Sequence, residues 1–125
     1  MSELVTWLWM ALAGGVGAAL RHLAHVGVQL AGGRSSWATL AVNAVGSFAL
    51  GLLVGWAGRL VPEAVLTILG TGLLGGFTTF STSSAESAEL WRDGRRDAAL
   101  VLATVMLVAS VAAAGAGWAL ASVLP

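Results

Sequence analysis

Four long apolar segments, separated by short polar stretches, make up almost the whole chain. They run from about residue 4 to 30, 37 to 58, 64 to 85 and 98 to 123. A helix of roughly 20 apolar residues is long enough to cross a bilayer. The pattern therefore predicts an all-α membrane protein in which residues 1–125 form a single domain with four transmembrane helices.

The third segment interrupts this pattern with polar residues. Between Gly70 and Glu86 it carries paired glycines, seven hydroxyl side chains and two phenylalanines. Polar groups at membrane depth are costly and usually mark a path or a binding site. Paired glycines followed by threonines also favour a break that exposes backbone groups to an ion. We therefore expect the third helix to be broken near Gly75–Thr79, and the chain to move or bind something small.

Composition narrows the class of protein. Hydrophobic residues make up 58% of the chain and charged residues 10%, whereas soluble domains carry about 25% charged residues. The formal net charge is zero and no basic cluster is rich in aromatic residues, so nucleic acid is not an expected partner. The chain has no cysteine, and no nucleophile–base pair or metal-ligand set lies at membrane depth. We do not expect an enzyme.

Arg21 lies in the first segment, where a central arginine costs about 2.5–3.5 kcal/mol to insert. The side chain either reaches the interface or has a fixed partner inside the bundle. If neighbouring segments are antiparallel, the ends that carry Arg21 and Glu86 lie on the same membrane side. Thr39 and Asn43, one helical turn apart, start from that side too. We expect one hydrogen-bonded cluster of Arg21, Thr39, Asn43 and Glu86, with His22 and His25 at the interface.

Small residues recur at four-residue spacing, which lets helix backbones approach closely in lipid. These positions are Gly51 and Gly55, Gly72 and Gly76, and Ala109, Ala113, Gly117 and Ala121. With 17 glycines in the chain, some of this spacing also arises by chance. Four thin helices enclose too little volume for a pore, so we expect an oligomer.

Three stretches are rich in glycine or hydroxyl residues: GGVGAALR at residues 14–21, TLAVNAVGSF at residues 39–48 and GGFTTFST at residues 75–82. They resemble motifs of the Fluc-type (CrcB) fluoride channels. Residues 14–21, GGVGAALR, resemble the family's glycine-rich opening that ends in arginine. Residues 39–48, TLAVNAVGSF, resemble T-L-x-V-N-x-x-G-S-F, and residues 75–82, GGFTTFST, resemble G-G-x-T-T-F-S-T. The three motifs occur in the family's order on three of the four segments.

The resemblance implies a fold and an activity. Members of this family are four-span subunits that form an antiparallel, dual-topology dimer in the cell membrane. Two pores conduct fluoride passively and selectively over chloride, which relieves fluoride toxicity. Gly75 and Thr78 match positions whose backbone carbonyls hold a structural sodium ion (Na+) at the dimer centre.

The resemblance also assigns residues to the fluoride path. Asn43 matches the asparagine near the pore, and Phe80 matches the first of two phenylalanines whose ring edges face fluoride. Ser81 and Thr82 match hydroxyl positions beside the path, while Arg21, Thr39 and Glu86 match the polar network around the asparagine. Hydroxyls are hydrogen-bond donors that can replace lost water around the ion, and Ser84 and Ser110 are further candidates.

Ser83 departs from the family pattern, because the motif continues F-S-T-F and this position belongs to the second phenylalanine. One pore face is therefore altered, weakened or closed. Arginine distribution is a second departure. The first and third loops contain Arg34, Arg92, Arg95 and Arg96, but the second contains only Arg59.

The positive-inside rule places the two arginine-rich loops in the cytoplasm and both termini outside. A fixed orientation suits a subunit whose partner is an oppositely oriented paralogue, so a heterodimer and a homodimer both remain open. Two other functions compete with a fluoride channel. A small multidrug exporter uses a carboxylate deep in its first span, where this chain has none. A non-conducting accessory subunit leaves the hydroxyl-rich third segment unexplained, unless the chain is a degenerate partner that no longer conducts by itself.

Overall fold

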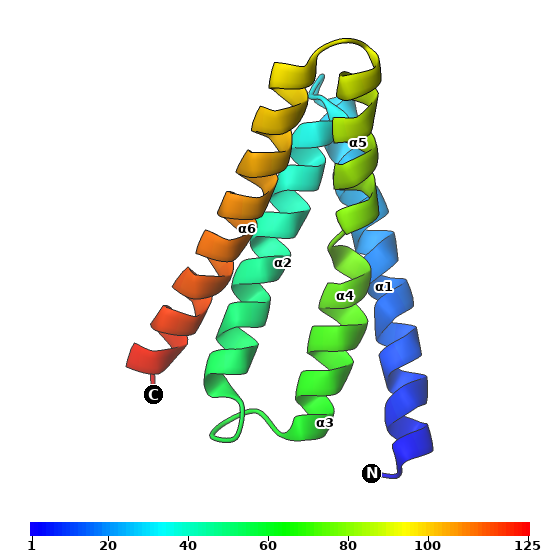
Figure 1. Cartoon of the computed structure of the whole chain (residues 1–125). Coiled ribbons are helices and arrows are strands. Elements are labelled where there is room, and N and C mark those ends of the chain that lie inside the picture. Colours follow the sequence, from blue (N-terminus) through cyan, green and yellow to red (C-terminus); the bar gives the residue numbers. More distant parts are fainter.

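The computed structural model describes all 125 residues and consists of helices joined by short loops (Figure 1). Three spanning helices are continuous: α1 (Glu3–Leu30), α2 (Ser35–Trp56) and α6 (Arg96–Val123). The remaining span is divided into α3 (Glu63–Leu66), the π-helical η1 (Thr67–Leu74), α4 (Gly75–Phe77) and α5 (Phe80–Arg92). Four stretches are long and apolar enough to cross a membrane, which confirms the all-helical, four-span prediction.

The third span ends later than its apolar pattern predicts. We expected a polar connection from residue 86 to 97, but α5 continues to Arg92 and only residues 93–95 form the loop. The expectation was wrong because Ala, Glu and Leu in this stretch favour helix even where the sequence becomes polar. Gly94, with a φ of 79°, makes the turn after α5. The Arg95 N–H then donates to the Leu90 carbonyl at 2.9 Å.

Two of the three loops lie at one end of the bundle, and the third loop lies at the other end with both termini (Figure 1). In Figure 1 the α1–α2 and α5–α6 loops meet at one end, while both termini and the α2–α3 loop lie at the other. α2 packs mainly against α6, α1 packs against η1 and α4, and α5 leans on α6. Many large apolar side chains remain exposed on the outer faces, as expected for a surface that meets lipid or another subunit.

Glycines make the two main helix contacts possible. A Cβ atom at Gly51 would overlap the Ala114 carbonyl, and one at Gly117 would overlap the Phe48 carbonyl. Cβ atoms at Gly72 and Gly76 would likewise crowd the backbone of α1. The predicted glycine pairs are thus confirmed as places where backbones approach in the membrane.

Replacing Gly117 with alanine is expected to destabilise the protein, because the added methyl group collides with the backbone of α2. Overpacking of this kind costs about 1–3 kcal/mol. Gly115 is the matched control, since it lies on the same helix and nothing stands within 4 Å of its Cβ position. Melting temperatures in detergent should fall for Gly117→Ala and hold or rise for Gly115→Ala. Equal melting temperatures would contradict the assigned contact.

Candidate functional site

The backbone leaves the helical conformation at two threonines between α4 and α5. Thr78 has φ −81° and ψ 160°, and Thr79 has φ −149° and ψ 121°. Both residues are therefore extended, and the helical hydrogen-bond pattern stops at membrane depth. A buried peptide group that leaves this pattern needs another partner.

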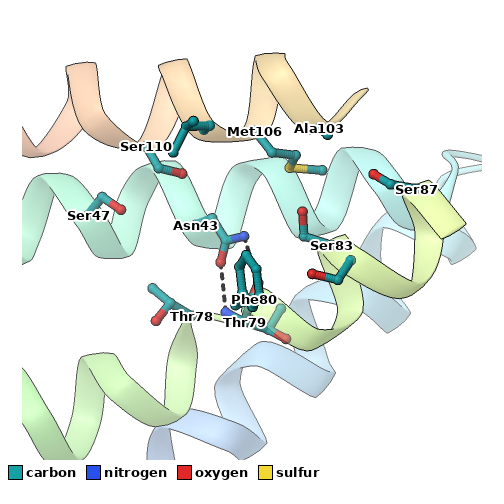
Figure 2. Close-up of a pocket in the computed structure, with 12 residues that line it drawn as sticks. Asn43, Ser47, Thr78, Thr79, Phe80, Ser83, Ser87, Ala103, Met106 and Ser110 are labelled. Carbon is teal, nitrogen blue, oxygen red and sulfur yellow. Dashed lines mark hydrogen bonds between the residues drawn. The ribbon is translucent and has the colours of Figure 1, made fainter. Parts of the chain in front are cut away.

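Asn43 of α2 supplies that partner with both ends of its amide. Its Oδ1 accepts the Thr79 N–H at 2.7 Å, and its Nδ2 donates to the Thr79 carbonyl at 2.9 Å (Figure 2). The two residues are 9% and 5% exposed, so water does not compete for these bonds. Gly46, almost one turn along α2, lets the two segments meet, because a Cβ there would overlap the Thr78 methyl group.

The Thr79 side chain caps the N-terminus of α5. Its Oγ1 accepts the Thr82 N–H at 3.1 Å and donates to the Thr82 hydroxyl at 3.1 Å, and it lies 3.4 Å from Ser81 Oγ. Ser81 and Thr82 therefore gather around the helix cap. Neither lines the groove described next, and their place beside a fluoride path stays a prediction.

A groove of about 530 Å³ lies between α2, α5, α6 and the extended threonines (Figure 2). It brings together five of the residues predicted for the path: Asn43, Phe80, Ser83, Ser84 and Ser110. The wall is completed by Ser47, Thr78, Thr79, Ser87, Ala103, Met106 and Leu107. The Phe80 side chain is 87% exposed, so the groove is open on one side of the single chain.

The groove serines differ from other hydroxyl residues of the chain in their hydrogen bonding. Thr67 and Thr78 donate to the carbonyl four residues earlier, as hydroxyls in membrane helices often do. None of the serines in the groove makes a hydrogen bond within the chain: Ser47, Ser83, Ser84, Ser87 and Ser110. Their O–H groups are available to whatever occupies the groove.

Arg21 and Glu86 do not pair, which corrects the predicted single cluster. The Arg21 guanidinium donates from Nη1 to the Thr78 carbonyl at 3.3 Å. Glu86 Oε1 instead accepts from the hydroxyls of Ser35 and Thr39, each at 2.9 Å. The two charges separate because Arg21 reaches the break, whereas Glu86 lies more than one turn along α5 toward the loop end.

His25 links these two groups, although we expected it at the interface. Its Nδ1 lies 3.0 Å from the Arg21 carbonyl and its Nε2 lies 3.1 Å from Thr39 Oγ1. The ring is half-buried between α1 and α2, while His22 is exposed, and the depth of both residues in the membrane stays a prediction. One signal was present in the sequence: His25 stands one turn after Arg21 on the same face of α1.

The break also removes the usual amide partners of the two carbonyls predicted to bind sodium. In a continuous helix Gly75 would accept the Thr79 N–H, and Thr78 would accept the Thr82 N–H. These amides bond instead to Asn43 and to the Thr79 hydroxyl. Carbonyls released from a helix are the kind of ligand that sodium uses in membrane proteins. At Thr78, however, the carbonyl also holds the Arg21 guanidinium.

Comparison with known proteins decides the family. Residues 8–118 match the family model described as "CrcB-like protein, Camphor Resistance (CrcB)". The chain belongs to the CrcB family. Its relatives in Mesorhizobium japonicum and Deinococcus radiodurans are both named fluoride-specific ion channel FluC.

These CrcB relatives match almost end to end. The Mesorhizobium protein is 39% identical over 120 residues, which cover 94% of this chain and 97% of the relative. The Deinococcus protein is 44% identical over 114 residues, which cover 89% of this chain and 90% of the relative. The resemblance inferred from the three motifs is thereby confirmed.

Replacing Asn43 with alanine is expected to lower the free energy of unfolding by about 2–5 kcal/mol, because a buried peptide N–H and a carbonyl each lose a partner worth about 1–3 kcal/mol. Ser47→Ala is the control, since Ser47 lies one turn away in the same groove and makes no hydrogen bond in the chain. The measurement is reversible unfolding in mixed micelles. If both variants unfold alike, Asn43 does not hold the break.

Proposed function

We propose that this chain forms a fluoride-selective channel through which fluoride leaves the cell passively, relieving fluoride toxicity. The chain is a multi-pass protein of the cell membrane and not an enzyme. The observation that carries the proposal is the groove with five serine hydroxyls that bond to nothing within the chain. The name shared by the relatives supports fluoride as the ion.

The donors of the groove suit a small, strongly hydrated anion. Each serine offers one O–H, and the Asn43 amide keeps one N–H beyond the one that it gives to Thr79. Hydrogen bonds to an ion are stronger than those between neutral groups. They can therefore replace water that fluoride leaves behind when it enters the membrane.

Two positive features lie close to the same level of the bundle. The helix α5 begins at Phe80, so the positive end of its dipole faces the groove. The Arg21 guanidinium bonds to Thr78, whose side chain lines the groove. Both features favour an anion in the groove.

Phe80 contributes its ring to the path. The edge of a phenyl ring is the positive part of its quadrupole and can face an anion. The ring stands beside Asn43 in the groove (Figure 2), yet is 87% exposed in the single chain. A second subunit packed in the opposite orientation would cover it and close the open side of the groove.

A sodium ion at the centre of this dimer completes the proposal. The carbonyls of Gly75 and Thr78 would hold it, because the helix break turns their usual amide partners away. The break at Thr78 and Thr79 is then the element that serves both the cation and the anion path. Sodium would supply a fixed positive charge that locks the subunits together, while the chain's hydroxyls conduct fluoride.

The competing functions are not favoured. The relatives are named as fluoride channels, and the first span lacks the deep carboxylate of a small multidrug exporter. A non-conducting accessory role leaves the unbonded groove serines without a ligand.

Purified protein in liposomes is expected to release fluoride rapidly and to retain chloride. A fluoride electrode measures the first ion and a chloride electrode the second, with empty liposomes as the control. Efflux should fall at least tenfold for Phe80→Ala, because the path loses its ring, while Trp118→Ala on the outer face of α6 should conduct normally. Folded protein that releases both ions or neither would refute a self-sufficient fluoride channel.

Orientation is expected to be fixed by four arginines at one end of the bundle against one at the other. The chain has no cysteine, so single cysteines report their side of the membrane without a background. In intact cells, a membrane-impermeant maleimide should modify Leu60→Cys and spare Asp93→Cys. In cells that pattern would require a paralogous partner for an antiparallel dimer, whereas protein reconstituted from detergent meets copies in both orientations. Half-labelling at both positions would show dual topology and a homodimer.

A further inference from the structure

Ser83 and Ser87 form a pair of hydroxyls on the groove side of α5. They are one helical turn apart and both line the groove (Figure 2). Ser83 is 9% exposed and makes no hydrogen bond in the chain. Ser87 Oγ is buried and also lacks a partner. The first of these positions is where the family motif has its second phenylalanine.

A buried hydroxyl without a partner is unfavourable, because it has lost its hydrogen bonds to water without replacing them. Protein interiors rarely leave such a group unsatisfied unless it serves a ligand, water or function. The facing residues of α6, Met106 and Ala103, provide neither a strong donor nor a strong acceptor. What bonds to these hydroxyls must therefore come from the contents of the groove.

The position of the pair extends the path. In Figure 2 Ser110, Asn43, Ser83 and Ser87 follow one another along the groove. Ser87 lies toward the end with the α5–α6 loop, almost two turns beyond Phe80. Glu86, the adjacent carboxylate, is outside the groove lining and bonds to Ser35 and Thr39, so it does not occupy the hydroxyls.

We propose that Ser83 and Ser87 form an anion-binding position where fluoride rests between Asn43 and the loop end of the groove. In this chain two hydroxyl donors take the place of a phenyl edge. The proposal rests on the proposed function, because it assumes that fluoride occupies the groove. It also gives Ser83 a direct role in binding fluoride along the path. The loss of the aromatic ring alone would instead indicate a weakened path.

The test uses the full chain in liposomes and the variants Ser83→Ala, Ser87→Ala and Ser87→Thr. Each alanine variant should raise the fluoride concentration for half-maximal efflux about tenfold, since one bond to an ion is lost. Ser87→Thr keeps the hydroxyl and should remain within threefold of the parent. Ser122→Ala is the control, because that hydroxyl already donates to the Ala119 carbonyl outside the groove.

A second measurement separates ligand binding from a structural role. Removing an unpartnered buried hydroxyl should leave the melting temperature unchanged or raise it, so the variants remain folded. At one fixed sodium concentration, added fluoride should stabilise the parent by mass action and stabilise Ser83→Ala and Ser87→Ala less, whereas chloride at that same sodium concentration should stabilise none of them.

Two negative results are distinguishable. If the parent conducts fluoride but the alanine variants match it in half-maximal concentration and in fluoride stabilisation, the Ser83–Ser87 position is refuted and the channel stands. If the folded parent neither conducts fluoride nor is stabilised by it, the proposed function fails and the anion position fails with it.

Discussion

Two hydrogen bonds between one side-chain amide and one peptide group stabilise the break in the third span at membrane depth. Asn43 bonds to both the N–H and the carbonyl of Thr79. These bonds replace the helical hydrogen bonds that the backbone loses at the break. In hydrocarbon no water can take over this role. The extended threonines, the cap of α5 and the redirected carbonyls all follow from that pair. Gly46 makes it geometrically possible by leaving room for Thr78.

The same constraint divides the hydroxyl residues into two groups. Those that support the scaffold are bonded: Thr79 caps α5, and Thr39 joins α2 to Glu86. Those that line the groove are not bonded within the chain, so their donors stay available. Asn43 belongs to both groups, since one amide hydrogen holds the break and the other remains for a ligand. The residues that support the fold and those that line the path thus lie at the same level of the membrane. A mutation that affects only one of the two roles must therefore be chosen by the atom it removes as well as by the residue.

The sequence predicted what depends on local patterns. Apolar runs predicted the four spans, spaced glycines predicted the close helix contacts, and three motifs predicted the family. The sequence failed to predict hydrogen-bond partners that depend on how the helices pack in three dimensions. Opposite charges suggested that Arg21 would meet Glu86, but the released Thr78 carbonyl is the nearer partner for the guanidinium. His25 and Ser35 were missed because their bonding to the Thr39–Glu86 pair depends on how α1 and α2 cross. Ser87 carried no motif, and only its burial without a partner marks it.

The single chain leaves one side of the groove uncovered. Phe80 is almost fully exposed at the depth where its neighbours Asn43 and Thr79 are buried. A groove that is polar on its inner wall and open on the other side would present hydroxyls to lipid, which cannot bond to them. The second subunit proposed above would supply the missing wall. If that subunit has the opposite orientation, the arginine-rich ends of the two subunits lie on opposite faces of the membrane. The charge bias of four arginines against one acts against that arrangement for two copies of the same chain, so the proposed dimer pairs this chain either with a copy inserted against the bias or with a paralogue of the opposite bias.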